Sequence, residues 1–81
     1  MAISKIEAAL PGLIYHKPDP DSPAFKKDGD EVAVGDTVAL VEVMKSFLPV
    51  EAEVAGTFKG YVAPDGESVE AGDVICEIEV A

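Results

Sequence analysis

The second half of this chain repeats the residue pattern of the first half, and this repeat limits how the chain can fold. A shift of 37 positions brings matching residues together, in order, over a run of sixteen positions. The matching pairs are Asp28/Asp65, Gly29/Gly66, Val32/Val69, Gly35/Gly72, Asp36/Asp73, Val38/Ile75, Val41/Ile78, Glu42/Glu79 and Val43/Val80. Each copy consists of an Asp-Gly turn, a short strand, a Gly-Asp turn and a longer strand. We therefore predict two pseudo-symmetric halves built from short strands and tight turns.

The segments between these turns have the composition of β-strands. β-Branched and aromatic side chains are concentrated in residues 13–15, 38–43, 57–63 and 74–80. Apolar residues alternate with acids at 41–43 and 78–80, although Ile75 interrupts the alternation of the last segment. Residues 3–10 run directly into Pro11-Gly12, which would end a helix, so we expect them to form a lead-in or first strand. The sequence predicts an all-β fold.

Composition narrows the function as well as the fold. The chain has 81 residues, of which 16 are acidic and 6 are lysine, and its formal net charge is −10, yet 48% of its residues are hydrophobic. This length allows one domain, and the apolar content argues against disorder. The negative charge disfavours nucleic acid and anionic membranes as partners. Because Cys76 is the only cysteine and His16 the only histidine, we expect no disulfide and no metal, and we predict a cytoplasmic protein.

One stretch of the first copy has no counterpart in the second. Gly12 aligns with Gly56 at a shift of 44 rather than 37, so the first copy carries seven extra residues, which fall within residues 17–25. Three prolines in this stretch fix φ and remove backbone donors, so we expect a stiff, projecting loop with Phe25 anchoring its base. The loop is either a solvated surface loop or a functional protrusion.

A second unusual segment lies between the two copies. Residues 41–43 and 46–50 have the pattern of two strands, which would place Met44 and Lys45 at the tip of a tight hairpin. Such turns favour Asn-Gly or Asp-Gly, because both central residues often need a positive φ. An exposed methionine beside a lone lysine breaks this rule, and such departures often mark functional sites. The alternative is an ordinary solvated lysine on a turn.

The sequence around this lysine resembles the attachment signature of a known family. Residues 42–45, Glu-Val-Met-Lys, are similar to the Glu-Ala-Met-Lys motif of biotinyl domains, the carriers of biotin-dependent carboxylases. The likeness extends from about residue 10 to residue 80 and includes Pro11-Gly12, Val34-Gly35-Asp36-Thr37, Glu51-Ala52-Glu53 and Gly56-Thr57. The chain differs from the family pattern at Val43, where alanine is usual, and at Ser46, where a second methionine is common.

The extra loop resembles a feature of one branch of this family. Biotin carboxyl carrier domains of bacterial acetyl-CoA carboxylases carry a thumb, a Thr-Pro-Ser-Pro-Asp-like loop that ends in Ala-Phe and leans over the biotin. The corresponding residues in this chain are Pro18, Pro20, Asp21, Ala24 and Phe25. Lys17 stands where the family usually has a hydroxyl residue that can hydrogen-bond biotin.

The resemblance implies a fold and a set of site residues. The implied fold is a flattened barrel, or barrel-sandwich hybrid, of two pseudo-symmetric four-stranded antiparallel sheets with a thumb insertion. One domain would span residues 1–81, with a core at about 10–80, a thumb at about 17–24 and a biotin-bearing hairpin at about 43–46. The implied site residues are Lys45 as biotinyl-lysine, Met44, Val43 and Ser46 for ligase recognition and the hairpin tip, and Lys17, Pro18, Asp19, Pro20 and Asp21 in the thumb.

The implied function is that of a biotin carboxyl carrier with no catalytic residue of its own. A biotin protein ligase would use ATP to join biotin to Lys45, and the tethered biotin would shuttle between a biotin carboxylase and a carboxyltransferase as carboxybiotin. The thumb favours an acetyl-CoA carboxylase of fatty acid biosynthesis, and urea-type or other acyl and amide carboxylases stay open. The start Met1-Ala2-Ile3-Ser4 favours a free-standing carrier over an excised domain.

Two other functions stay open at this point. A lipoyl carrier domain of a 2-oxo acid dehydrogenase has the same fold and a lysine on the same hairpin. Its usual signature is Asp-Lys-Ala, which Met44-Lys45-Ser46 does not match. The second alternative is an adaptor module with an unmodified lysine, whose acidic surface would bind a basic partner.

Overall fold

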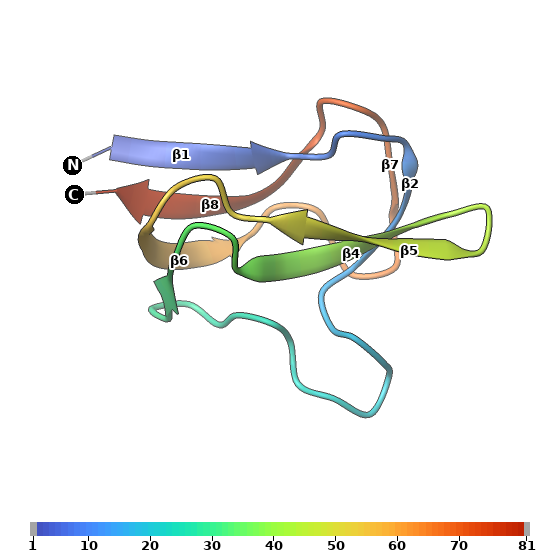
Figure 1. Cartoon of the computed structure of the whole chain (residues 1–81), viewed down its shortest axis with the longest axis horizontal. Helices are drawn as coiled ribbons and strands as arrows, with labels where there is room; N and C mark the ends of the chain where they lie inside the picture. The colour runs from blue at the N-terminus through green and yellow to red at the C-terminus, as the bar shows by residue number, and fades with distance from the viewer. Residues whose placement is uncertain (1, 81) are drawn as a thin grey trace.

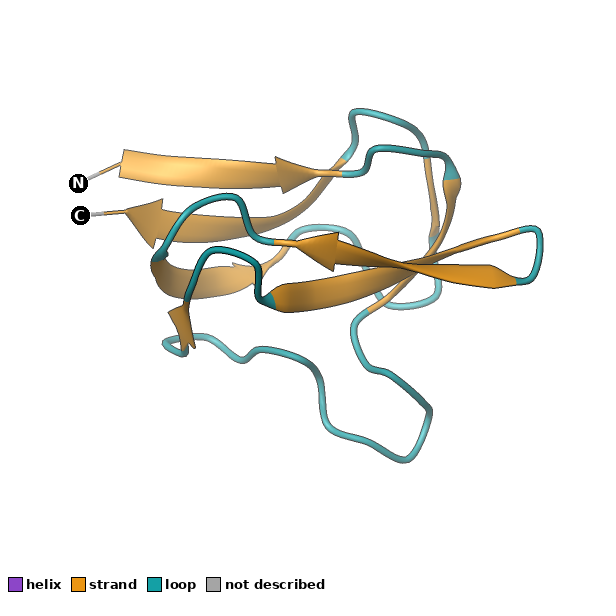
Figure 2. Cartoon of the chain, viewed as in Figure 1, coloured by secondary structure: helices purple, strands orange, loops and turns teal. Residues whose placement is uncertain are grey.

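The computed structural model describes residues 2–80, which form eight strands and no helix, and hence no helix that could cross a membrane (Figures 1 and 2). The strands are β1 (Ala2–Glu7), β2 (Gly12–Tyr15), β3 (Glu31–Val32), β4 (Thr37–Val43), β5 (Ser46–Glu51), β6 (Gly56–Tyr61), β7 (Ser68–Val69) and β8 (Val74–Val80). The expectation of a natural start at Met1 lies outside this range.

The strands form two four-stranded antiparallel sheets, which confirms the predicted all-β fold. The strand order is β1-β8-β6-β3 in one sheet, called here the first sheet, and β5-β4-β2-β7 in the other, the second sheet. A shift of 44 carries β1 and the start of β2 onto β5 and the start of β6, and a shift of 37 carries β3 and β4 onto β7 and β8. Equivalent strands occupy equivalent places in the two sheets, so the sequence repeat is a structural repeat.

Gly12 and Gly56 begin equivalent strands at points where the backbone passes close to a neighbouring strand. A Cβ at Gly12 would collide with the carbonyl oxygen of Glu42, and a Cβ at Gly56 would collide with the carbonyl oxygen of Glu79. Only glycine allows this approach without moving a backbone segment. The repeat therefore extends to the packing of strand against strand.

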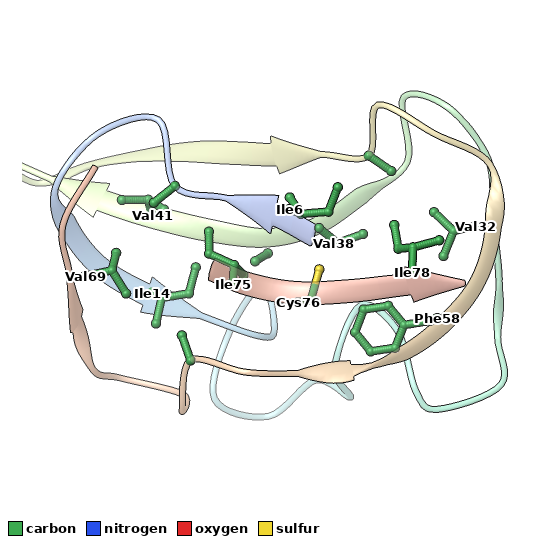
Figure 3. Packing of buried hydrophobic residues seen from close by; sticks show 14 residues of the cluster. Ile6, Ile14, Val32, Val38, Val41, Phe58, Val69, Ile75, Cys76 and Ile78 are labelled. Atoms are coloured by element: carbon green, nitrogen blue, oxygen red, sulfur yellow. The ribbon is translucent and has the colours of Figure 1, made fainter. Parts of the chain in front are cut away.

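The core lies between the two sheets (Figure 3). Its largest fully buried side chains are Phe58, Ile14, Ile75, Ile78, Val38 and Cys76. The pairing registers skip Val38 in β4 and Ile75 in β8, which marks a β-bulge at the same place in each copy. The bulge in β8 lets both Ile75 and Cys76 face the core, and this explains why Ile75 interrupts the alternation of its strand.

Cys76 leads to a prediction about alkaline stability. Burial raises the pKa of its thiol from 9.0 to about 11. Because the folded-state pKa is the higher one, this group's contribution to stability is complete below about pH 9 and is lost as the pH rises through about 11. We expect the free energy of unfolding to fall over this range, and to fall less steeply in Cys76→Ala. Urea unfolding at each pH measures both slopes, and equal slopes would contradict the prediction.

The hairpin that joins β4 to β5 lies at one end of the molecule, and the two chain ends lie at the other (Figure 1). β1 and β8 pair from Ala2 and Val80 inward, which holds the chain ends side by side. The longest dimension of the molecule is 37 Å. The fold therefore displays the hairpin at the end of the molecule opposite Ala2 and Val80.

Candidate functional site

The β4–β5 hairpin ends in a two-residue turn formed by Met44 and Lys45, as the sequence predicts. Val43 and Ser46 pair across the base of this turn. Met44 has a φ of 50° and Lys45 a φ of 67°, and within residues 2–80 no other non-glycine residue has a positive φ. This left-handed conformation costs an L-residue about 1–2 kcal/mol. The turn is therefore strained by its two side chains, at the position that the sequence singles out as functional.

Both turn residues are open to solvent. The Met44 side chain is 94% exposed, and Lys45 is also exposed. The ion pairs within residues 2–80 involve the ammonium groups of Lys26 and Lys59, so Lys45 takes part in neither. A primary amine on a flexible stem at a hairpin tip is accessible to an acylating enzyme.

The strain in the turn can be tested through stability. Met44→Asn combined with Lys45→Gly supplies residues that tolerate a positive φ, so we expect the free energy of unfolding to rise by about 1–2 kcal/mol. Urea unfolding measures the gain, with Met44→Ala as a control that keeps a residue unsuited to this conformation. A double variant no more stable than that control would show that the turn is not strained.

The extra residues of the first copy form a loop that projects between β2 and β3 (Figures 1 and 2). Residues 17–25 contain no strand. The Asp19 carboxylate organises the tip, because it accepts hydrogen bonds from the Asp21 N–H at 3.0 Å and from the Ser22 hydroxyl at 2.9 Å. The Phe25 N–H donates to the His16 carbonyl at 2.8 Å and closes the base of the loop. Phe25 thus lies at the base, where the sequence analysis expects it.

His16 fixes the N-terminal root of this loop. Its ring stacks on the ring of Tyr61 with centroids 3.6 Å apart, and its Nε2 lies 2.6 Å from the Ala63 carbonyl oxygen. The Tyr61 hydroxyl donates to the Val38 carbonyl at 2.6 Å, and burial raises the pKa of this hydroxyl to about 12. The two rings therefore position the loop on the barrel, which gives His16 a structural role.

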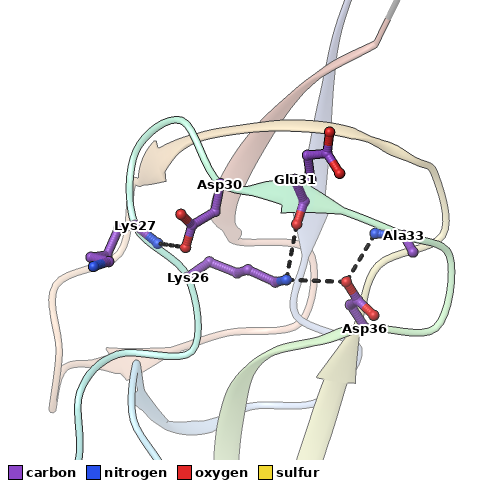
Figure 4. A network of polar contacts seen from close by, with 6 residues as sticks. All are labelled: Lys26, Lys27, Asp30, Glu31, Ala33 and Asp36. Carbon is purple, nitrogen blue, oxygen red and sulfur yellow. Dashed lines mark hydrogen bonds and ion pairs between the residues drawn. The ribbon is translucent and has the colours of Figure 1, made fainter.

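A polar network holds the C-terminal root of the loop (Figure 4). The Lys26 ammonium donates to the Asp36 carboxylate at 3.1 Å and to the Glu31 carbonyl at 3.0 Å. The Ala33 N–H donates to the same carboxylate at 2.9 Å, and this bond, followed by the bond from Lys26, lowers the pKa of Asp36. Both roots of the loop are therefore tied to the barrel.

A groove of about 550 Å³ lies between this loop and the second sheet. The residues that line it are Tyr15, Lys17, Pro18, Asp19, Pro20, Phe47 and Asp65. The rings of Tyr15 and Phe47 have centroids 6.0 Å apart. The Tyr15 hydroxyl donates to the Glu42 carboxylate at 3.1 Å, and this bond, together with partial burial and the charge of Glu42, raises the pKa of Tyr15. The groove thus combines aromatic rings with carboxylates and one lysine.

The groove brings most of the predicted loop residues together with the hairpin strand. Of the five named from the sequence, Lys17, Pro18, Asp19 and Pro20 line it, whereas Asp21 does not. Phe47, two positions after Lys45, also lines it, as do Tyr15 and Asp65. The sequence analysis did not single out these three residues. A two-residue turn at Met44 and Lys45 pairs Phe47 with Glu42 across the hairpin, so the position of the turn could have indicated Phe47. Tyr15 and Asp65 come from distant segments and carry no local signal of a site.

Comparison with known proteins finds a family and relatives that match most of the chain. The model of the family described as "Biotin-requiring enzyme" matches residues 4–78. The biotin carboxyl carrier protein of acetyl-CoA carboxylase from Haemophilus influenzae is 35% identical over 74 residues, which are 91% of this chain and 48% of that protein. The protein of the same name from Chlamydia muridarum is 37% identical over 73 residues, which are 90% of this chain and 45% of that protein.

A solved structure shares the fold. The crystal structure of the Kluyveromyces lactis urea carboxylase matches with a TM-score of 0.80 and 26% identity, over 98% of this chain and 6% of that chain. The chain spans about half the length of the two carrier proteins that it matches. The family match takes in all of β2 to β7 and the hairpin that carries Lys45. Because this match covers nearly the whole chain, the chain belongs to the biotin and lipoyl attachment family described as "Biotin-requiring enzyme".

Proposed function

We propose that the chain is a biotin carboxyl carrier domain in which Lys45 is the site of biotin attachment. The observation that carries this proposal is the exposed Lys45 amine, displayed by a strained turn at the end of the molecule opposite the chain ends. Family membership and the two carrier relatives support it. Met44 precedes the lysine in the turn, and Val43 and Ser46 close its base, so these three residues would present Lys45 to a ligase.

The chemistry of attachment needs little from this chain beyond a presented amine. A biotin protein ligase would activate the biotin carboxylate with ATP, joining it to AMP and releasing pyrophosphate. The unprotonated Lys45 Nζ then attacks the carboxyl carbon, the amide bond forms as the bond to AMP breaks, and the second amine proton passes to solvent. The net charge then changes from −10 to −11, because one cation is lost. When bound, biotin supplies the ureido nitrogen that carries a carboxyl group. The chain contributes reach, since a tethered group is held at high effective concentration near successive active sites.

The groove beside the hairpin is the proposed resting place of the biotin rings. Tyr15 and Phe47 offer aromatic surface, and Asp19 and Asp65 offer acceptors for the ureido N–H groups. Lys17 can only donate, so it suits the ureido oxygen. The loop would then act as the thumb that the resemblance implies, with its prolines keeping it stiff.

The names of the relatives suggest the partners of this chain. The relatives are named as carrier proteins of acetyl-CoA carboxylase, so we assign this chain a non-catalytic role between a biotin carboxylase and a carboxyltransferase of such an enzyme, in the cytoplasm. Within residues 2–80 there is no group of three His, Cys, Asp or Glu side chains that could hold a metal ion. A biotin protein ligase is the enzyme proposed to modify the domain.

Intact-mass measurement tests the proposal against its alternatives. The chain is co-expressed with a biotin protein ligase in one culture and with a lipoate ligase in another. We expect the mass to rise by one biotinyl group in the first culture. A lipoyl group in the second culture without biotin in the first would favour the lipoyl carrier. An unmodified chain in both cultures would favour the adaptor and overturn the proposal.

A further inference from the structure

Two rows of paired residues cross the outer face of the second sheet. One row is Leu13, Glu42 and Phe47, and the next is Tyr15, Leu40 and Pro49. Ile14 and Val41 lie between the rows and are buried, so the two rows themselves face outward. Only Glu42 in these rows is charged. The other five residues, Leu13, Tyr15, Leu40, Phe47 and Pro49, are called here the apolar face.

The equivalent positions of the first sheet are mostly polar or charged. Shifts of 44 and 37 carry the same six positions onto Thr57, Lys59, Glu77, Glu79, Ile3 and Lys5. Lys59 and Glu79 form an ion pair of 3.8 Å on that outer face. The framework therefore tolerates charges at these positions, and folding alone does not require the apolar residues of the second sheet. The groove proposed for biotin accounts for Tyr15 and Phe47. Leu13, Leu40 and Pro49 do not line that groove, so their presence needs another explanation.

The apolar face is partly exposed and adjoins the hairpin turn, since Tyr15 and Leu40 are half-buried and Pro49 is exposed. Phe47 is 56% exposed and Leu13 is 39% exposed. Met44, in the turn that joins the two strands of this face, is also an exposed apolar residue. A soluble domain rarely leaves clustered apolar side chains in water unless they contact a partner.

Four acidic side chains lie within or beside this face, and Lys17 is the one cation in the groove at its loop side. Glu42 lies within it, and Asp19 and Asp65 line the groove at its loop side. Glu51 follows Phe47 and Pro49 by alternation along the outer side of β5. A complementary surface would have an apolar centre and a border of lysine or arginine side chains.

We propose that the apolar face is the docking surface for the biotin protein ligase, which meets it with apolar side chains bordered by lysines or arginines. This inference rests on the function proposed above. The ligase must bring its active site to the Lys45 Nζ itself, so it has to cover the surface beside the turn. Enzymes that act later on the tethered group can stand away from the hairpin by the length of the tether.

Steady-state ligation measures this docking directly. Leu13→Thr/Phe47→Ser removes the two exposed side chains of the first row, and Leu13→Thr introduces the residue that the first sheet carries at Thr57. The matched control is Ile3→Ser, which removes a 49% exposed apolar side chain from the equivalent position of Phe47. With purified ligase at saturating biotin and ATP, we expect the KM for the double variant to rise about tenfold.

A second pair of variants tests the acidic residue beside the apolar face. Glu51→Lys reverses an acid at the border of the apolar face, and Glu7→Lys reverses the acid at the equivalent position of the first sheet. We expect the KM to rise several-fold in Glu51→Lys and to stay unchanged in Glu7→Lys at low salt. Urea unfolding of every variant checks that it is folded, and Phe47→Ser alone replaces the double variant if that protein does not fold.

The outcomes separate this inference from the proposed function. If the unmodified sequence takes up no biotin, the proposed function is wrong. If it is labelled normally and Leu13→Thr/Phe47→Ser has an unchanged KM, only the docking surface is wrong. An equal rise in Ile3→Ser, or a fall in kcat at constant KM, would also overturn the docking surface, because the first shows no preference between the sheets and the second shows positioning of Lys45 rather than binding.

Discussion

Lys45→Arg is expected to abolish biotin attachment completely, both during co-expression with a biotin protein ligase and in reactions of the purified protein with ligase, biotin and ATP. Arginine keeps the positive charge and a long, flexible stem at the hairpin tip. Its guanidinium remains protonated at all ordinary pH values, so it cannot supply the unprotonated nitrogen that forms the amide bond. The fold and the free energy of unfolding should be unchanged, because Lys45 is exposed.

The control for this prediction is a lysine elsewhere on the surface. Lys59→Arg, on the outer face of the first sheet, should be labelled as fully as the unmodified sequence, since only the hairpin lysine is presented at a tip. Intact mass followed by peptide mapping gives both the extent and the position of labelling. Biotin found at full occupancy on Lys45→Arg would mean that another lysine is the acceptor and that the site proposed here is wrong.

Phe58→Ala is expected to lower the free energy of unfolding by about 3–5 kcal/mol, the usual cost of truncating a buried aromatic side chain. Phe58 is fully buried between the sheets and packs edge-to-face against Tyr61, with ring centroids 4.8 Å apart. Total stabilities of small domains are about 5–15 kcal/mol, so this single change removes a large part of the total. We expect a marked fall in the urea midpoint and in the thermal midpoint.

Phe47→Ala is the matched control, because it truncates the same type of side chain at a position that is 56% exposed. Its effect on the free energy of unfolding should stay within about 0.5–1 kcal/mol, as for most surface substitutions. Equal losses in the two variants would contradict the core described here and would place Phe47 in a structural role instead of at the proposed docking surface.

The parts of the fold that were predictable from the sequence are those encoded locally. Asp-Gly and Gly-Asp turns and β-branched segments indicate where strands begin and end, and the repeat predicts two related halves. The two four-stranded sheets were implied by the family resemblance, because each sheet takes strands from both halves. The hairpin turn was predictable for the same reason, because Met44 and Lys45 stand between two strand-forming runs. The bulges at Val38 and Ile75 were visible only as a broken alternation, since the extra residue is defined by the register of the neighbouring strand.

The surroundings of the site were less predictable because they depend on contacts between distant segments. The stack of His16 on Tyr61 joins residues 45 positions apart. The hydrogen bond from Tyr15 to Glu42 crosses from β2 to β4. The spacing of such residues in the sequence does not indicate that they touch. The groove and the apolar face therefore became visible only once the pairing of the strands was known. Whether the loop residues hold biotin remains a prediction from the family resemblance.

The pairing of Ala2 with Val80 has an architectural consequence. In the second sheet, Val43 and Ser46 pair at the base of the turn formed by Met44 and Lys45, and the shifts of 37 and 44 carry these two residues onto Val80 and Ala2. Ala2 and Val80 therefore occupy the place where a second hairpin turn would stand if β8 led directly into β1. Each end of the barrel has a strand pair that a hairpin turn could join. At one end the Met44-Lys45 turn joins the pair, and at the other end the pair, Ala2 with Val80, is left unjoined. The repeat therefore displays a two-residue turn of this kind only at the end of the barrel opposite Ala2 and Val80, within the residues that the structure describes.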